Sequence, residues 1–169
     1  VFFDGNQYLI QRHEVSYSPS AGVLKLSADR KPANTRSCLL VGVSDERAPA
    51  VQQEIDSIRQ FFPKPKCLMG KAATVGALRG HSGSWDIVHI ASHALFSSGN
   101  PMFSRLRLAD GWLNVYDIYN LRLNASLVTL SSCQTGVGKT VGSDEIIGIS
   151  RGFLYAGAAS LLSSLWAVN

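Results

Sequence analysis

A histidine and a cysteine each follow a short apolar stretch of the same kind. His93 comes after IVHIAS (87–92), and Cys133 comes after LVTLSS (127–132). Both stretches are typical of strands buried on two sides, and both end in small polar residues. If the two strands are parallel neighbours, His93 and Cys133 emerge together at the carboxyl edge of the sheet, where open α/β sheets place their sites.

This pair has the residue types needed for nucleophilic catalysis. A free thiol titrates near about 8.5, so an imidazole has to supply thiolate at neutral pH, and the same imidazole can then protonate a leaving amine. The backbone N–H groups of Cys133 and of Ala94, which follows His93, are the expected oxyanion donors. The residues alone leave two interpretations open, a Cys–His dyad and a cysteine that only packs at the end of its strand, and the second is the commoner role of a cysteine in that position.

The residues from Cys133 onward suggest a second interpretation. CQTGVGKT (133–140) is similar to the phosphate-binding motif GxxxxGK[ST], but Cys133 replaces the first glycine. We expect the next helix to begin near Asp144 with Ser143 as its N-cap, so that the amides near Lys139 would not lie at a helix N-terminus. We therefore predict a glycine-rich loop after a strand, with nucleotide binding as the alternative.

A serine-hydrolase motif is present by spacing only. GISRG (148–152) matches GxSxG, which requires a strand and a sharp turn before the serine. Apolar residues flank it at helical spacing, so we predict that Ser150 lies inside a helix. Gly148 and Gly152, one turn apart, would let that helix approach the sheet closely.

His89 and His93 are spaced four apart, as in some zinc motifs. In a strand this spacing separates two residues by roughly 13 Å, too far for two ligands of one metal ion. We predict that His89 is a core histidine with a local hydrogen bond. Neither a metal nor an organic cofactor is expected.

Strand and helix patterns alternate along the rest of the chain. The predicted strands are 8–17, 38–44, 66–69, 87–92, 127–132 and 160–168, with a hairpin in 102–115 that turns at Asp110-Gly111. The predicted helices are 51–62, 71–79, 115–121 and 144–155. This order predicts a three-layer α/β/α sandwich with a mostly parallel central sheet.

Composition narrows the classes of function. The net charge is +4, but no run of Lys and Arg interleaved with aromatic residues appears, so no nucleic-acid partner is expected. Cys38, Cys67 and Cys133 are widely spaced without CxxC, which favours reduced thiols and a cytoplasmic location. The uncharged run 152–169 divides into a helix end, a turn and a strand, so we expect no membrane span.

Three segments together resemble a known family. They are VHIASHALF (88–96), SRLRLADGWLNVYDIYNLRLNASLVTLSSCQTGVG (104–138) and SDEIIGISRGFLYAGAASLLSSLWAV (143–168). They are similar to the CHAT domain, a caspase-like domain usually found beside tetratricopeptide repeats, and YLIQRHEVSYSPSAGVL (8–24) fits the opening strands of that family. We expect residues 1–169 to form one such domain, which would continue beyond Asn169.

The resemblance implies a caspase–separase-type fold with His93 and Cys133 as the catalytic dyad of a cysteine endopeptidase. The implied partners are a protein substrate and tetratricopeptide repeats in the same or a partner chain. Ala94 stands where the family commonly has Gly, and Gln134 where it often has Glu. An inactive CHAT module that acts in protein interaction or scaffolding therefore remains the alternative.

Asp144 belongs to an acidic pair that matches the family after the nucleophile loop. If its side chain faces the cleft, it would bind a basic residue before the scissile bond. The alternative is an acid in the first turn of a helix, stabilised by the helix dipole.

Overall fold

The structure is a computed structural model that describes residues 2–30, 36–46, 48–83, 85–95, 97, 100–132 and 143–163, with the backbone alone for 143–147. The strands within these ranges are β1 (Cys38–Gly42), β2 (Lys66–Met69), β3 (Trp85–Ala91), β4 (Ala94–Leu95), β5 (Arg105–Leu108), β6 (Gly111–Asn114), β7 (Ala125–Ser131) and β8 (Ser160–Ser163). The α-helices are α1 (Ala21–Ala28), α2 (Val51–Arg59), α3 (Val75–Gly80), α4 (Val115–Tyr119) and α5 (Ser143–Tyr155). Short 3₁₀ helices are η1 (Leu9–Gln11), η2 (Gly70–Ala72) and η3 (Pro101–Phe103).

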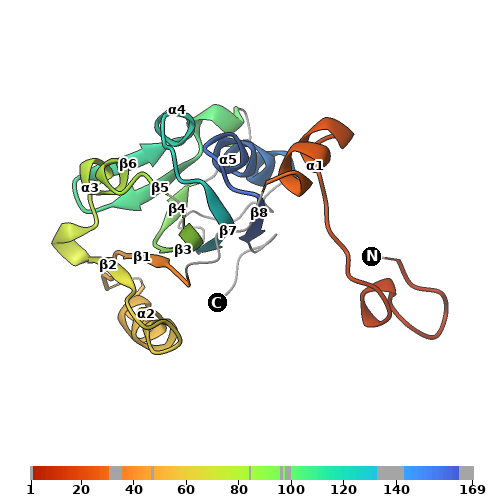
Figure 1. Ribbon diagram of the computed structural model, residues 1–169, viewed down its shortest axis with the longest axis horizontal. Helices are drawn as coiled ribbons and strands as arrows, with labels where there is room; N and C mark the ends of the chain where they lie inside the picture. The colour runs from red at the N-terminus through yellow and green to blue at the C-terminus, as the bar shows by residue number, and fades with distance from the viewer. Residues whose placement is uncertain are drawn as a thin grey trace.

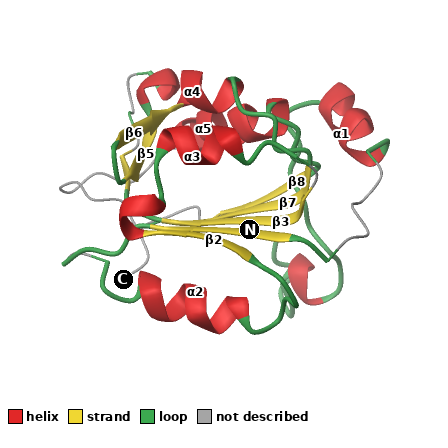
Figure 2. Ribbon diagram, turned by 60° about the vertical axis from the view of Figure 1, so that its left-hand side comes forward, coloured by secondary structure: helices red, strands yellow, loops and turns green. Residues whose placement is uncertain are grey.

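The central sheet has the strand order β2-β1-β3-β7-β8 within the described residues, and each of these pairs is parallel. A second, antiparallel sheet has the order β4-β5-β6. Figure 2 shows the central sheet edge-on, with α2 on one face and α3, α4 and α5 on the other. The predicted three-layer α/β/α sandwich with a mostly parallel sheet is confirmed.

The central strands bury side chains on both faces. Every residue of β1 is buried, as its continuous apolar run predicted. Leu40 packs with Ile55 of α2 on one face, whereas Leu39 packs in the larger cluster that contains Phe153 of α5. A parallel sheet covered by helices on both sides requires such strands.

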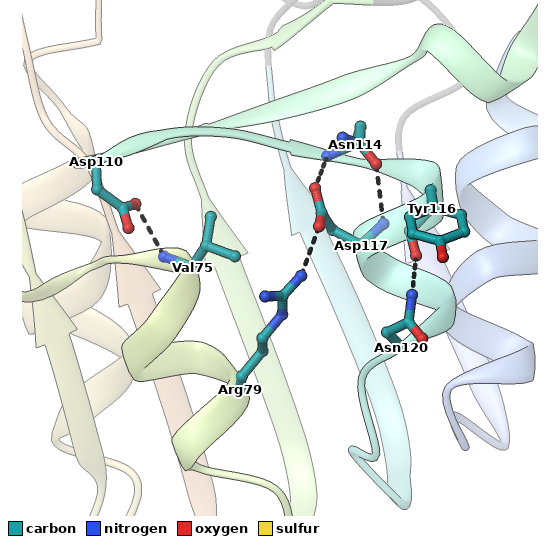
Figure 3. Close-up of polar contacts among 7 residues, drawn as sticks. All are labelled: Val75, Arg79, Asp110, Asn114, Tyr116, Asp117 and Asn120. Carbon is teal, nitrogen blue, oxygen red and sulfur yellow. Dashed lines mark hydrogen bonds and ion pairs between the residues drawn. The ribbon is translucent and has the colours of Figure 1, made fainter.

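Polar contacts fix the β5–β6 hairpin to the helices beside it (Figure 3). Asp110 Oδ1, in the hairpin turn, accepts a hydrogen bond from the N–H of Val75 at the start of α3, at 2.9 Å. Arg79 of α3 forms an ion pair with Asp117 of α4 at 2.6 Å. Asp117 also forms a capping box with Asn114. The second sheet begins directly after His93, and these contacts fix its β5–β6 hairpin to α3 and α4.

Helix α5 contains the GxSxG match, with Ser150 inside the helix as predicted. A Cβ atom on Gly148 would lie 2.6 Å from Pro101 Cβ in η3, and one on Gly152 would lie 3.0 Å from Ile118 Cγ2 in α4. The two glycines therefore allow close packing, but against η3 and α4 rather than against the sheet as predicted. The helix position rules out a nucleophile elbow at Ser150.

The predicted strand 8–17 is wrong. This segment contains η1, and a single bridge between Phe3 and Tyr8 is the extent of its described pairing. Figure 1 shows it extending away from the sheet, so its alternating pattern has no neighbouring strand to complete the hydrogen bonds. Helix α1, which the sequence analysis did not predict, follows it with Ser20 as its N-cap.

Two smaller predictions are corrected in position. The helix expected at 71–79 is split into η2 and α3, because Thr74 Oγ1 caps α3 by accepting from the N–H of Ala77 at 3.0 Å. The hairpin turns at Ala109 and Asp110 rather than at Asp110-Gly111, since Gly111 already pairs with Leu108.

Candidate active site

The strands that lead to His93 and Cys133 are parallel neighbours, which was the condition for bringing the two residues to one edge. In the β3–β7 ladder Ala91 is the register partner of Ser131. The ladder continues past the end of β3, because the N–H of Ser92 donates to the carbonyl oxygen of Ser131 at 3.1 Å. His93 therefore leaves the carboxyl edge of the sheet beside the end of β7.

His93 is buried, with 5% of its surface exposed. Its Nε2 atom lies 2.7 Å from Asp45 Oδ1, a distance typical of a charge-assisted hydrogen bond. Its Nδ1 atom is also buried and has no hydrogen-bond partner among the described residues. One ring nitrogen of His93 thus contacts a carboxylate, and the other has no hydrogen-bond partner in the described part of the chain.

Asp45 comes from the loop after β1, the strand that neighbours β3 on the side opposite β7. Its Oδ1 atom also accepts from the N–H of Ala48 at 3.1 Å, and Ser44 Oγ donates to the Ala48 carbonyl at 3.2 Å. The side chain of Asp45 is 45% exposed. The carboxyl ends of three adjacent strands, β1, β3 and β7, therefore meet at this edge.

His89 lies four residues before His93, inside β3, and both of its ring nitrogens lie close to polar side chains. Its Nδ1 atom is 2.6 Å from Thr129 Oγ1 on β7, and its Nε2 atom is 3.1 Å from Glu54 Oε1 on α2, at ion-pair distance but outside hydrogen-bond angle. The other oxygen of Glu54 accepts from Ser131 Oγ at 3.1 Å. The predicted core histidine is confirmed, and its partners come from α2 and β7.

The electrostatics of Glu54 follow from these contacts. The interaction with His89, and to a smaller extent the hydrogen bond from Ser131, lower the pKa of Glu54 from its ordinary value, although partial burial acts in the opposite direction. The ionised carboxylate of Glu54 is thus favoured in the folded protein, where it ties α2 to β3 and β7.

Ala94 is the first residue of β4, is fully buried, and pairs with Leu106 of β5. It is not among the described residues with positive φ, so an alanine fits this position without the strain that a glycine would relieve. The N–H of Arg107 donates to the His93 carbonyl at 2.8 Å. In an antiparallel pair of strands, hydrogen-bonded and non-hydrogen-bonded residue pairs alternate, so the next pair, Ala94 with Leu106, is a non-hydrogen-bonded one. The N–H of Ala94 is therefore directed away from β5.

Several residues singled out from the sequence lie outside the described residues. These are Cys133, Gln134 and the GVGKT run with Lys139, and the side chain of Asp144 is likewise not described. Helix α5, which contains Asp144, begins at Ser143. The dyad, the loop and the substrate contact of Asp144 therefore stay predictions.

The described thiols differ in their surroundings. Burial raises the pKa of the Cys38 thiol to about 12, with smaller contributions from Cys67 and Asp86. A thiol with this pKa carries almost no thiolate at neutral pH and is a poor nucleophile. Cys67 is half-buried on β2. Cys38 is thus a packing residue of the core.

Three or more His, Cys, Asp or Glu side chains placed to hold one metal ion were not found in the described part of the chain. His89 and His93 instead bind different carboxylates.

No described helix has the length and apolar character needed to cross a membrane.

The family model for the CHAT domain matches residues 2–169. The chain belongs to the CHAT domain family. CHAT is a caspase-like family, in agreement with the sandwich fold described above. The chain is also similar to tetratricopeptide repeat protein 28 of Mus musculus, with 43% identity over 56 residues. That match covers 33% of this chain and 2% of the mouse protein, so the CHAT domain spans a small part of its relative's length.

Two carboxylates of this CHAT domain, Asp45 and Glu54, were not predicted from the sequence. Asp45 carried a usable signal, because it follows a buried strand in the way that His93 does. Nothing in the sequence marked Glu54, because acidic residues are common on the polar side of an amphipathic helix. Its buried partner, His89, lies on a strand far away in the chain.

Proposed function

We propose that this CHAT domain is a cysteine endopeptidase that uses His93 and Cys133. The observation that carries the proposal is the register of the central sheet. Ala91 and Ser131 are partners in the parallel ladder, and His93 and Cys133 each follow two residues later. Strands that end side by side bring the residues after them to one edge, which supports a reaction between the two side chains.

The chemistry follows from the unpartnered Nδ1 atom of His93. Nδ1 takes the proton of the Cys133 thiol, and the thiolate sulfur attacks the carbonyl carbon of the scissile peptide bond. The tetrahedral intermediate collapses to a thioester as the C–N bond breaks, and the imidazolium gives its proton to the leaving amine. Water then attacks the thioester with Nδ1 as base, which releases the carboxylic acid and the free thiol.

Ala94 and Cys133 supply the oxyanion donors in this proposal. The N–H of Ala94 is directed away from β5, which supports its availability to a substrate carbonyl oxygen. We further propose that Asp144, in the first turn of α5, binds a basic residue before the scissile bond. Attraction between the carboxylate and a Lys or Arg side chain gives the preference.

The substrate is a protein segment, presented by tetratricopeptide repeats of the same or a partner chain. The name of the mouse relative supports this partner class. Work in the cytoplasm fits the reduced thiol that the reaction needs.

An inactive CHAT module for protein interaction is the second candidate function. Large apolar side chains stand exposed in the segment before β1, among them Ile10 at 72% and Tyr17 at 83%. Such exposed apolar groups favour contact with another protein surface.

The test is cleavage of a proteome-derived peptide mixture, with new N-termini identified by mass spectrometry. The wild-type chain should produce cleavages after Lys or Arg that are absent with Cys133→Ala and with His93→Ala, and Asp144→Asn should weaken the basic preference. Cleavage that persists in the Cys133→Ala variant, or no cleavage by any form, would contradict the peptidase and favour the interaction module.

A further inference from the structure

We propose that Asp45 is a positioning residue that holds His93 in the Nε2–H tautomer, so that the Nδ1 lone pair is available to take the thiol proton. The proposal rests on the proposed peptidase function for its catalytic consequence. Its structural part, the tautomer of His93, can be tested without any peptidase activity.

The contact between Asp45 and His93 determines where the imidazole proton lies. A carboxylate accepts hydrogen bonds and donates none, so a neutral histidine 2.7 Å from Asp45 Oδ1 must carry its hydrogen on Nε2. The Nδ1 atom then has a free lone pair. Without the carboxylate, a neutral imidazole in water distributes its proton between the two nitrogens.

The burial of Nδ1 gives the second argument. Buried polar atoms without a hydrogen-bond partner are rare in proteins, because nothing compensates their loss of contact with water. Nδ1 of His93 is such an atom within the described part of the chain. His89 differs, because its one buried nitrogen without a hydrogen bond, Nε2, lies 3.1 Å from Glu54 Oε1, and its Nδ1 is bonded to Thr129. A base, unlike a structural histidine, needs the free nitrogen that His93 has.

The position of Asp45 in the fold suits this role. The loop that bears it is held by contacts with Ala48, and β1 is paired with β3 as far as Ala91, two residues before His93. The N–H of Val43 donates to the carbonyl of Ala91 at 3.0 Å, which continues the β1–β3 ladder toward the contact. Asp45 also faces the positive charge that His93 gains when it takes the thiol proton, so the same contact stabilises the intermediate.

The test compares Asp45→Asn with Glu46→Gln, which removes the same charge from the exposed neighbouring residue. The first readout is the ¹⁵N NMR spectrum of the His93 ring at a pH where it is neutral. Wild type and Glu46→Gln should show a protonated Nε2 and an unprotonated Nδ1. Asp45→Asn should shift the population toward the Nδ1–H form, because an amide can donate to Nε2 as well as accept from it.

The second readout is peptide cleavage. Asp45→Asn should lower kcat by on the order of 100- to 10,000-fold with KM changed less than about threefold, as expected when a catalytic histidine is held in the wrong tautomer. Asp45→Glu should recover part of the loss, and Glu46→Gln should behave as wild type.

The outcomes separate the two proposals. An Nδ1–H tautomer in the wild type, or a His93 spectrum and kcat unaffected by Asp45→Asn, would overturn the role of Asp45. The predicted tautomers together with no cleavage by any variant would support the positioning by Asp45 and count against the peptidase. Circular dichroism of each variant identifies any loss of the fold, and the wild-type spectrum tests the tautomer whatever the variants do.

Discussion

Glu54 of α2 and His89 of β3 lie 3.1 Å apart, between the helix layer and the central sheet. The same carboxylate accepts from Ser131 at the end of β7. A single acidic side chain therefore links α2 to the two strands that lead to His93 and Cys133. This link is structural, and its strength depends on the charge of Glu54.

Replacing Glu54 by Gln should lower the free energy of unfolding at pH 7 by about 1.5–3 kcal/mol, the range for hydrogen bonds to charged groups. The folded state lowers the pKa of Glu54 from its ordinary value of 4.5. The stabilisation is therefore complete above about pH 4.5 and is lost as the pH falls through the lower, folded pKa. Urea denaturation at a series of pH values measures this difference.

The control is Asp56→Asn on the same helix, where the carboxylate accepts only a surface hydrogen bond from Gln52 among the contacts described. This variant should change the unfolding free energy by less than about 0.5 kcal/mol. A Glu54→Gln variant as stable as wild type at pH 7, or a deficit that does not shrink in acid, would show that the link contributes nothing.

Gly148→Ala should destabilise the protein by about 1–3 kcal/mol, because the new methyl group would overlap Pro101 in η3. Gly76 of α3 offers a matched comparison, since a Cβ atom there meets nothing within 4 Å. Gly76→Ala should stabilise by about 0.5–1 kcal/mol through higher helix propensity. Thermal melts of both variants give the comparison, and opposite signs are the expected result. Equal effects would mean that α5 does not pack closely on η3.

Cys38 should resist alkylation in the folded protein. Its side chain is buried, so the reagent cannot reach the sulfur. Burial also raises the pKa of the thiol to about 12, so almost no reactive thiolate is present at pH 8. Iodoacetamide treatment followed by peptide mapping should label Cys38 only after denaturation in urea. Labelling of Cys38 in the native state at the rate of the denatured state would contradict its place in the core.

Ala94→Gly should leave kcat within about threefold of wild type, because Ala94 is extended in β4 and does not need the conformational freedom of glycine. The expected side effect is a small loss of stability, about 0.5–1 kcal/mol, from the more flexible unfolded chain. Steady-state kinetics and a thermal melt measure the two effects. A gain of tenfold or more in kcat would show that the alanine misplaces the oxyanion donor.

The inner strands of the central sheet were predicted well from the sequence, because β1, β3 and β7 contain apolar runs typical of strands with both faces covered. The predicted strand at 8–17 was wrong, because this segment alternates apolar and polar residues but has no neighbouring strand among the described residues with which to form a ladder. The two glycines of α5 were recognised as packing positions, but only the tertiary structure identifies Pro101 and Ile118 as their neighbours.

The candidate site was predictable in part for the same reason. His93 and Cys133 follow patterned strands, whereas Asp45 and Glu54 act through contacts with residues far away in the chain. The contact of Asp45 with His93 depends on the neighbourhood of β1 and β3, which local spacing does not encode.

The most direct test of the peptidase is the rate at which Cys133 reacts with a peptidyl acyloxymethyl ketone that carries arginine next to the reactive group. Peptide mapping locates the adduct, and the second-order rate constant is compared between wild type and His93→Ala. We expect an adduct on Cys133 that forms at least about 100-fold more slowly in His93→Ala than in wild type. A Cys133 that reacts equally fast in both proteins, or no faster than in the denatured chain, would contradict this expectation.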